Sequence, residues 1–356
     1  MQVVKVDIDT AAPKHPEASI LIIYTGGTVG MVFDEKEQHL VPFNFSQILD
    51  HVPELRQFNY LLTVLSVEPA IDSSNVSVKD WLMLARLIGE NYDKYDGFVI
   101  LHGTDTMAYS SSALSYLLEN LQKPVIFTGA QVPIGRIRTD ARENLITALQ
   151  IAATKNEQGH SMVPEVCVYF RNLLLRGNRS KKVESSHFDA FKSDNYPALA
   201  ETGIDIEYSQ EHILPHPQLH FRAHNKLDDR VAILKLFPGI TPQVVRSVLQ
   251  APDVKGVVME TFGSGNAPTT PWFLDLLQEA VDRGVYILNV SQCDEGRVDQ
   301  GRYETSKYLL NMGTIGGADI TTEAAITKLM YVLGLELDAE QTSWLLQSNL
   351  RGEISL

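Results

Sequence analysis

The chain has 356 residues, with 44% hydrophobic and 21% charged residues, and this composition fits a globular protein with a substantial core. Its 30 basic and 44 acidic residues give a formal net charge of −14, which argues against a nucleic-acid or anionic-membrane partner and suits a small-molecule enzyme. The 2 cysteines, Cys167 and Cys293, form neither a disulfide framework nor a zinc-ligand spacing.

Targeting and membrane signals are missing from the sequence. Residues 1–19 mix acidic and basic side chains and lack the apolar centre of a signal peptide. No apolar segment approaches the roughly 20 residues that cross a bilayer. We therefore expect a cytoplasmic protein.

Strand-like and helix-like segments alternate along most of the chain, a pattern typical of an α/β protein with a parallel sheet. In chain order, the predicted strands are 20–24, 60–67, 97–101, 124–128, 165–170, 231–237, 254–259 and 285–290. The helices predicted with both bounds are 45–52, 140–154, 243–250, 272–283, 321–337 and 339–349. Two further helices are predicted to begin after the capping-box residues 77–80 and at about residue 105. Residues 29–43 are predicted to form a loop.

Periodicity fails between residues 209 and 227, so we place the domain boundary there. The prediction is an N-terminal domain at 1–208, a linker at 209–227 and a C-terminal domain at 228–356. Histidines recur every four residues in this segment, at His212, His216, His220 and His224. Pro215 and Pro217 exclude a regular helix that would align them, and four residues of strand span roughly 13 Å. We therefore predict no metal site, and since nucleotide-binding motifs are missing as well, no cofactor.

Two predicted strands run directly into threonine–glycine turns. Strand 20–24 leads into Thr25-Gly26-Gly27-Thr28, and strand 97–101 leads into His102-Gly103-Thr104-Asp105-Thr106. Ligands bind outside the carboxyl ends of parallel strands, so we expect both turns to face one pocket. A threonine hydroxyl needs a base to become a nucleophile, and an amine with a carboxylate can complete such a relay.

The candidates for this relay are Thr25, Thr104, Asp105 and Lys182. The neighbouring glycines would let backbone N–H groups approach and stabilise an oxyanion. Each feature has a simpler interpretation when taken alone: the first turn could cradle a phosphate, Asp105 could cap a helix, and Lys182 could be a solvated side chain. The combination is what favours catalysis.

A polar turn, Asp72-Ser73-Ser74, follows the strand 60–67. It could be a plain turn. Alternatively, its hydroxyl and backbone N–H groups could hold the α-carboxylate of an amino acid, while its carboxylate holds the α-ammonium group.

Together these stretches resemble the L-asparaginase family, and in particular its cytoplasmic type I branch. The stretches that carry the resemblance cover nearly the whole chain, and they are 24–28, 72–74, 102–107, 176–179 with Lys182, and 313–319. The resemblance implies an α/β fold with a larger N-terminal parallel-sheet domain and a smaller C-terminal α/β domain. It also implies a homodimer or homotetramer that needs no metal or cofactor.

The resemblance implies the hydrolysis of L-asparagine to L-aspartate and ammonia. By the family pattern, Thr25 attacks the side-chain amide and forms an acyl-enzyme, while Thr104, Asp105 and Lys182 handle protons and activate water. The implied substrate-binding residues are Asp72, Ser73, Ser74, Gly103, Thr104, Asp105 and Ala130. Among these, Ser73 would hold the α-carboxylate, Asp105 would meet the α-amino group, and Ala130 would lie near the leaving amide.

The chain departs from the family pattern in the loop after the first motif. Many members carry a tyrosine there that helps to activate the nucleophile, whereas residues 29–43 contain none and His39-Leu40-Val41-Pro42 takes the matching place. We expect another group to assist Thr25, with Tyr24 as the alternative. Lys182 is assigned by its spacing from Arg176, and Lys181 is the second choice.

Two other functions remain open. One is a glutaminase-type amidase, for example one that serves transfer-RNA amidation; only about twenty residues precede the first strand, whereas such proteins carry an extra N-terminal domain. The other is an inactive asparagine-binding regulatory protein. The presence of all four candidate catalytic residues favours an active asparaginase over this second alternative.

Overall fold

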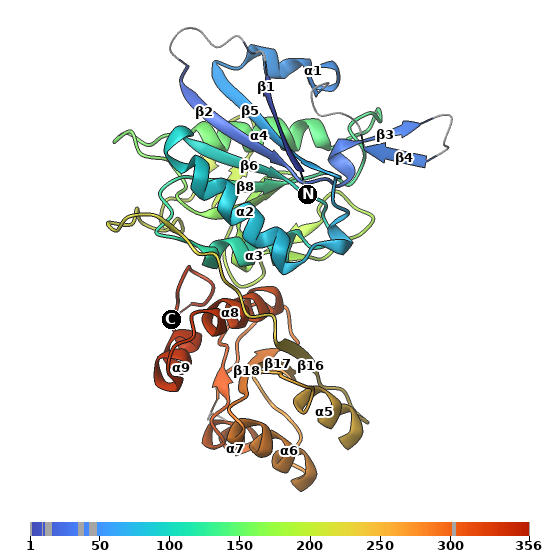
Figure 1. The fold of residues 1–356 in the computed structure, drawn as a ribbon, viewed down its shortest axis with the longest axis vertical. Helices are drawn as coiled ribbons and strands as arrows, with labels where there is room; N and C mark the ends of the chain where they lie inside the picture. Colours follow the sequence, from blue (N-terminus) through green and yellow to red (C-terminus); the bar gives the residue numbers. More distant parts are fainter. Residues whose placement is uncertain are drawn as a thin grey trace. The chain divides into compact units, whose positions relative to one another are not determined.

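The computed structural model describes residues 2–8, 10, 16–34, 39–42, 48–300 and 304–355. The chain forms two compact units, of which the first comprises Met1–Ser193 with Pro197–His224 and the second Asp194–Tyr196 with Asn225–Leu356. Each unit has its own sheet and helices (Figure 1). The predicted α/β class, with a larger N-terminal part, is confirmed. Residues 209–224 lie in the first unit, and the domain limits 1–208 and 228–356 stay a prediction.

Among the described residues, nine strands form the main sheet of the first unit, in the order β1-β5-β2-β6-β8-β9-β10-β13-β14. Their bounds are β1 Gln2–Ile8, β2 Ala18–Tyr24, β5 Tyr60–Glu68, β6 Gly97–Leu101, β8 Val125–Thr128, β9 Val166–Phe170, β10 Leu173–Arg176, β13 Ala200–Thr202 and β14 Ile206–Tyr208. The central strands β5, β2, β6, β8 and β9 are parallel. These five central strands are the ones that the apolar runs predict for this unit. Each predicted strand end lies within about two residues of the observed end.

The sheet is mixed rather than wholly parallel. β1 pairs antiparallel with β5, and β10, β13 and β14 extend the other side antiparallel. Sequence reasoning missed these outer strands because β1, β13 and β14 are only partly buried, while β10 is mostly buried but only four residues long. β1 shows this directly, since buried, half-buried and exposed positions mix along its length.

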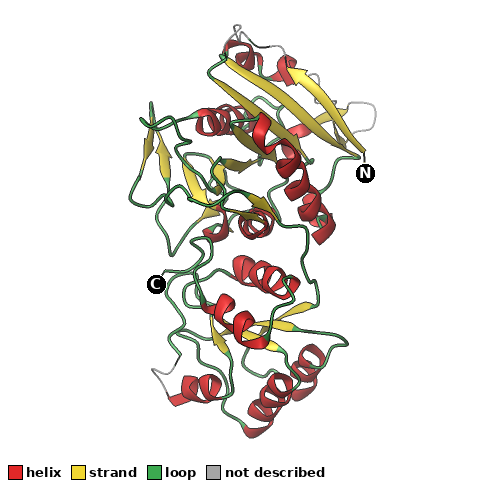
Figure 2. Cartoon of the chain, turned by 60° about the vertical axis from the view of Figure 1, so that its left-hand side comes forward, coloured by secondary structure: helices red, strands yellow, loops and turns green. Residues whose placement is uncertain are grey.

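Three long helices cover the sheet of the first unit: α2 Val78–Asn91, α3 Met107–Leu117 and α4 Ala141–Ala153. Figures 1 and 2 show α2 and α3 on one face and α4 on the other, where α4 packs on β2, β6 and β8. The predicted capping box starts α2, since Ser77 N donates to Asp80 Oδ2 over 2.8 Å. In the described parts of the chain, no helix is long and apolar enough to cross a membrane.

The segment after the first threonine motif is not the loop that the sequence predicts. Strands β3 Met31–Asp34 and β4 His39–Pro42 pair antiparallel as a hairpin. Short alternating runs of this kind are hard to recognise in sequence, because a two-stranded ribbon carries little burial signal. The predicted helix 45–52 is described only from α1 Ile48–His51 onward, and residues 45–47 lie outside the described residues.

Small strand pairs fix the later part of the first unit. β11 Lys181–Lys182 pairs with β12 Phe191–Lys192, and β7 Leu118–Glu119 pairs with β15 Arg222–Ala223. A buried ion pair does the same for the segment before β15: Arg176 Nε lies 2.5 Å from Glu165 Oε2, Arg176 Nη2 donates to His212 O over 2.8 Å, and Leu214 N donates to Glu165 Oε1. These contacts explain why residues 209–224, although aperiodic, belong to the first unit.

The second unit has a parallel sheet in the order β16-β17-β18-β19. Its strands are β16 Val231–Lys235, β17 Gly256–Thr261, β18 Tyr286–Ser291 and β19 Ile315–Gly316, and its helices are α5 Pro242–Leu249, α6 Pro271–Asp282, α7 Glu304–Asn311, α8 Thr322–Gly334 and α9 Ala339–Gln347. Apolar side chains of α5, α6 and the sheet form one core, and α8 packs on β17. The predicted helices of this region are confirmed, whereas α7 was not predicted.

The C-terminal segment of the second unit closes over a buried ion pair. Lys328 Nζ lies 2.7 Å from Glu353 Oε1, and both side chains are 0% exposed. Burial lowers the pKa of Lys328, and the Glu353 carboxylate opposes that shift. Lys328 also donates to Ser348 O, while Glu353 accepts from the backbone N–H groups of Leu350 and Arg351.

We expect Glu353→Gln to lower the free energy of unfolding of the second unit by about 3–5 kcal/mol, because it leaves the charge of Lys328 buried without its partner. Urea unfolding followed by tryptophan fluorescence measures this loss. The matched control is Glu336→Gln, which breaks the exposed Lys226–Glu336 pair and should cost less than about 1 kcal/mol. Equal losses in the two variants would contradict a structural role for the buried pair.

Candidate active site

Thr25 lies immediately after β2, at its carboxyl end. Tyr24, the last residue of β2, is in register with Leu101, the last residue of β6. The two strands therefore end together and their turns start side by side. Thr25 is buried, its N–H donates to Leu101 O over 3.0 Å, and its Oγ1 donates to the same carbonyl over 2.9 Å.

The two threonine motifs touch through glycine backbone. Gly27 has φ 84°, and a Cβ atom on it would lie 2.5 Å from Gly103 Cα; a Cβ on Gly26 (φ 135°) would lie 2.3 Å from Ile71 O. Only a residue without a side chain fits such an approach, and both φ values lie where other residues are strained. Gly27 thus lets the two turns lie against each other, as expected for a shared pocket, while Gly26 lets the first turn lie against the segment before the polar turn 72–74.

Lys182 joins the second threonine to its neighbouring carboxylate. Lys182 Nζ lies 2.7 Å from Thr104 Oγ1 and 2.6 Å from Asp105 Oδ1, and it donates to both. Lys181 and Lys182 form the short strand β11, where successive side chains point to opposite sides. This alternation explains why Lys182, rather than the second choice Lys181, meets Thr104.

Gln131 also contacts Thr104. Thr104 Oγ1 donates to Gln131 Oε1 over 3.2 Å, and Gln131 Nε2 donates to His187 O over 3.1 Å. The second bond orients the amide, so that its oxygen faces Thr104. Sequence reasoning missed Gln131, although it directly follows Ala130 at the carboxyl end of β8, the position where ligands of parallel sheets bind.

The turn that carries Ala130 is fixed from the start of α4. Asp140 accepts hydrogen bonds from Gln131 N and Val132 N over 3.0 Å each, and Asn144 Nδ2 donates to Gly129 O over 3.0 Å. Ala130 itself is buried. The spacing of Asp140 and Asn144 places both side chains on one face of the first helical turn, a signal that the sequence contains but that was not recognised.

The polar turn 72–74 meets the second motif through Ser73. Ser73 is buried, its carbonyl accepts from Thr106 Oγ1 over 2.7 Å, and a Cβ on Gly103 would lie 2.5 Å from Ser73 Oγ. Asp72 and Ser74 are exposed, and Asp72 Oδ1 accepts from Ser74 N as the cap of a 3-10 turn. Asp72 is thus part of a structural turn, while Ser73 is packed against Gly103.

His102 forms part of the core beneath the second motif. Its Nδ1 donates to Gly103 O over 2.6 Å and its Nε2 accepts from Ser110 Oγ over 3.0 Å. Burial lowers the pKa of His102, against the raising effects of Gly103 O and Asp80. The imidazole is therefore neutral at pH 7, and it supports the turn instead of supplying a charge.

The four regularly spaced histidines have separate surroundings. His216 Nε2 donates to Ser161 O over 2.8 Å, whereas His224 Nε2 lies 2.9 Å from Glu119 Oε2. Arg176 binds the backbone of His212, as described above. Over the residues that the structure describes, no group of three or more His, Cys, Asp or Glu side chains could hold a metal ion.

Hydroxyl, ammonium and carboxylate groups thus gather outside the carboxyl ends of neighbouring parallel strands, the arrangement of an α/β enzyme. A family model described as "Asparaginase, N-terminal" matches residues 19–214, and one described as "Glutaminase/Asparaginase C-terminal domain" matches residues 230–346. The chain belongs to the asparaginase family.

Individual relatives agree with this assignment. L-asparaginase 1 of Escherichia coli K12 is 43% identical over 342 residues, which cover 95% of this chain and 98% of that protein. The crystal structure of L-asparaginase I from Vibrio cholerae superposes with a TM-score of 0.87 at 41% identity, covering 95% of this chain and 99% of that one. A mouse protein named 60 kDa lysophospholipase is 41% identical, over 96% of this chain but only 63% of its own length.

These relatives confirm the family and the type I branch that the motifs indicated. They also confirm the predicted enzyme class, a hydrolase that acts on amides, at the level of the family. The roles of the individual residues stay predictions. The contacts described above show which side chains each role would involve.

Tyr24 is the alternative group for activating Thr25, and its surroundings argue against that role. Its hydroxyl donates to Gly30 O over 3.2 Å, and burial raises its pKa to about 12. A phenol with this pKa stays protonated at neutral pH and cannot accept a proton from Thr25.

We therefore expect Tyr24→Phe to keep kcat/KM for asparagine within about threefold of the unaltered enzyme between pH 6 and 9, since it removes the hydrogen bond to the Gly30 carbonyl but no base. Initial rates of ammonia release across this pH range measure the effect. Loss of the alkaline limb of the pH profile, or a drop of a hundredfold or more in a folded variant, would assign Tyr24 a catalytic role.

Proposed function

We propose that this protein is a cytoplasmic L-asparaginase that converts L-asparagine to L-aspartate and ammonia through an acyl-enzyme on Thr25. The observation that carries the proposal is the contact of Lys182 Nζ with both Thr104 Oγ1 and Asp105 Oδ1. Thr104 and Asp105 belong to the turn that lies against the Thr25 turn. A homodimer or homotetramer is part of the proposal and rests on the family resemblance.

In the first step, Thr25 Oγ1 attacks the side-chain amide carbon of asparagine and loses its proton. Thr25 rests as a donor to the Leu101 carbonyl, which accepts hydrogen bonds but cannot serve as a base. The proton must therefore pass to another group when substrate binds. Collapse of the tetrahedral adduct breaks the C–N bond, and the departing nitrogen takes a proton and leaves as ammonia.

In the second step, water attacks the acyl-enzyme and releases aspartate with a regenerated Thr25 hydroxyl. Thr104 and Lys182 are placed to relay the proton of this water. Lys182 donates to Thr104 in the resting state, so it becomes an acceptor only after it loses one proton, since an ammonium group has donors alone. Asp105 orients the amine through the 2.6 Å contact of its Oδ1 with Lys182 Nζ.

Substrate recognition is assigned to the residues around these groups. Ser73 would hold the α-carboxylate, the exposed carboxylate of Asp105 would meet the α-ammonium group, and Ala130 would face the amide. Backbone N–H groups at the glycine turns would stabilise the oxyanion. Asp72 and Ser74 would shape the turn that carries Ser73. Gly103 would let the substrate approach the backbone.

The proposal is tested by measuring ammonia release from asparagine and from glutamine over a range of concentrations. An asparaginase should favour asparagine by about 10- to 200-fold in kcat/KM, the discrimination that one methylene usually gives. Higher kcat/KM for glutamine would establish the glutaminase-type alternative. Binding of asparagine without turnover would establish the inactive regulatory protein.

We expect Thr25→Ala to lower kcat by roughly 10³-fold or more, because it removes the nucleophile. Thr25→Ser, which keeps a hydroxyl, should recover a measurable part of the rate. Mass spectrometry after acid quenching should show an aspartyl adduct on the unaltered protein and none on the alanine variant. Near-normal turnover in a folded Thr25→Ala protein would rule out this nucleophile.

The neighbouring lysines provide a matched pair for the proton relay. Lys182→Met should reduce kcat by about 10²- to 10⁴-fold, the range typical of general acid–base groups, whereas Lys181→Met should leave kcat within a few-fold of normal. Circular dichroism of both variants controls for folding. If Lys181→Met proves the more damaging change, the assignment of Lys182 is wrong.

A further inference from the structure

Two side chains at the start of α4 hold the turn that carries Ala130. Asp140 accepts from Gln131 N with both carboxylate oxygens, over 3.1 Å at Oδ1 and 3.0 Å at Oδ2. Asn144 Nδ2 donates to Gly129 O over 3.0 Å and to Asp140 Oδ2 over 3.2 Å. The peptide groups before and after Ala130 are therefore both tied to the first turn of α4.

These bonds fix the direction in which the backbone of Ala130 points. In a trans peptide the C=O and the N–H point to opposite sides of the chain, and both peptide bonds of Ala130 are trans. The Gln131 N–H points at Asp140, so the Ala130 carbonyl points away from the start of α4. The Gly129 carbonyl points at Asn144, so the Ala130 N–H points away from it as well.

The turn contacts the second threonine motif on both sides of Ala130. A Cβ atom on Gly129 would lie 2.4 Å from His102 O. On the other side, Gln131 Oε1 accepts from Thr104 Oγ1 over 3.2 Å. Ala130 is therefore held beside the motif that carries the proposed proton relay.

The backbone of Ala130 is buried but has no partner within the part of the chain that the structure describes. Ala130 is 1% exposed, and neither its C=O nor its N–H forms a hydrogen bond with the described residues. Buried backbone groups are almost always paired. A carbonyl oxygen that is buried, unpaired and held in one direction fits an N–H donor of a bound ligand.

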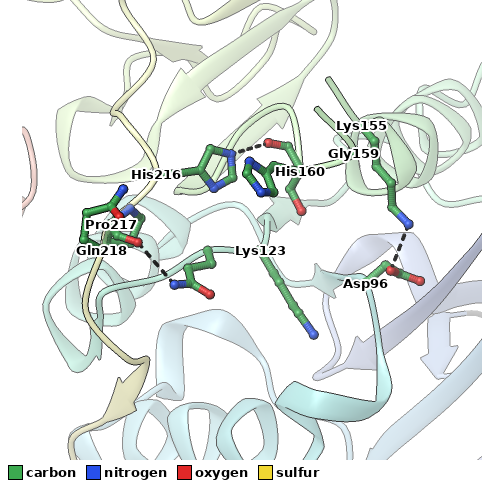
Figure 3. Close-up of a pocket in the computed structure, with 10 residues that line it drawn as sticks. Asp96, Lys123, Lys155, Gly159, His160, His216, Pro217 and Gln218 are labelled. Carbon is green, nitrogen blue, oxygen red and sulfur yellow. Dashed lines mark hydrogen bonds and ion pairs between the residues drawn. The ribbon is translucent and has the colours of Figure 1, made fainter. Parts of the chain in front are cut away.

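A cavity elsewhere in the first unit shows the usual pairing of polar groups (Figure 3). Lys155 Nζ lies 3.1 Å from Asp96 Oδ1, and His216 Nε2 donates to Ser161 O over 2.8 Å. These groups have partners within the protein, whereas the carbonyl of Ala130 has none among the described residues.

We propose that Asp140 is a positioning residue that aims the Ala130 carbonyl at the nitrogen leaving asparagine, so that the site selects leaving groups with N–H donors. This inference rests on the proposed function, in which Ala130 faces the side-chain amide. When the C–N bond of the tetrahedral adduct breaks, the nitrogen takes a proton and leaves as ammonia. A hydrogen bond from a nitrogen that gains positive charge is stronger than one from a neutral amide. The carbonyl therefore assists the departure step more than the binding of substrate.

An ester substrate separates this role from general support of the fold. L-Aspartate β-methyl ester would give the same acyl-enzyme on Thr25 as asparagine does. Its C–O bond breaks instead, and the methoxy oxygen takes one proton from the relay and leaves as methanol. That oxygen carries no hydrogen before it leaves, and its single new proton is shared with the relay. The Ala130 carbonyl therefore gives no assistance to the ester.

The test compares kcat/KM for asparagine and for the ester in Asp140→Asn of the full-length protein. Aspartate formation is measured for both substrates, and spontaneous ester hydrolysis is subtracted. The variant places an NH₂ group where a carboxylate oxygen accepts, so one backbone N–H of Gln131 or Val132 loses its acceptor. We expect kcat/KM for asparagine to fall about tenfold more than kcat/KM for the ester. The ratio does not depend on the folded fraction, because both substrates are measured on one sample.

Two further variants complete the test. Asn144→Ala frees the Gly129 carbonyl on the other side of Ala130 and should shift the ratio in the same direction. Its result decides if Asp140→Asn does not fold. The control is Glu143→Gln, which removes a carboxylate from an exposed position in the same helical turn and should leave the ratio unchanged.

The role of Asp140 is overturned if both substrates slow equally in Asp140→Asn and Asn144→Ala. It is also overturned if Glu143→Gln shifts the ratio as much as Asp140→Asn does. Failure of the unaltered protein to hydrolyse asparagine would overturn the proposed function and this inference together. Normal asparagine hydrolysis with an unshifted ratio would overturn the role of Asp140 alone.

Discussion

The active site depends on the parallel pairing of β2 with β6, which end in register at Tyr24 and Leu101. Hydrogen bonding between the strands sets their spacing at about 4.8 Å, so the turns that follow are neighbours before any side chain is considered. Gly27 then lets the two turns come into backbone contact at Gly103, and Gly103 in turn leaves room for Ser73. Thr25, Thr104 and Ser73 are brought to one place by this constraint.

Much of this could be predicted from the sequence, because the information is local. β2 and β6 are continuous apolar runs that are buried on both faces, and such runs identify central parallel strands. The residues that directly follow a strand are then placed at its carboxyl end with little freedom. Thr25 and Thr104 could be paired for this reason, and the recurrence of glycine beside both of them strengthened the interpretation.

The rest could not be predicted, because it depends on contacts between distant parts of the chain. The position of Gln131 after β8 places it at the edge of the sheet that carries the site, but it reaches Thr104 only because β8 lies beside β6. The antiparallel strand β1 owes its place to pairing with β5, and its own pattern is weak. Likewise, Arg176 stabilises a segment around His212 whose lack of periodicity had suggested a linker.

The contacts of Thr104 form a hydrogen-bond chain that runs in one direction. Lys182 donates to Thr104, Thr104 donates to Gln131, and Gln131 donates to the carbonyl of His187. Every link points the same way, and the chain ends at an oxygen that cannot pass a proton on. The Gln131 amide cannot turn round, because its oxygen would then face the carbonyl of His187, so only the link between Lys182 and Thr104 can reverse. A proton can therefore enter or leave this hydrogen-bond chain only at its Lys182 end, where Asp105 lies beside the ammonium group.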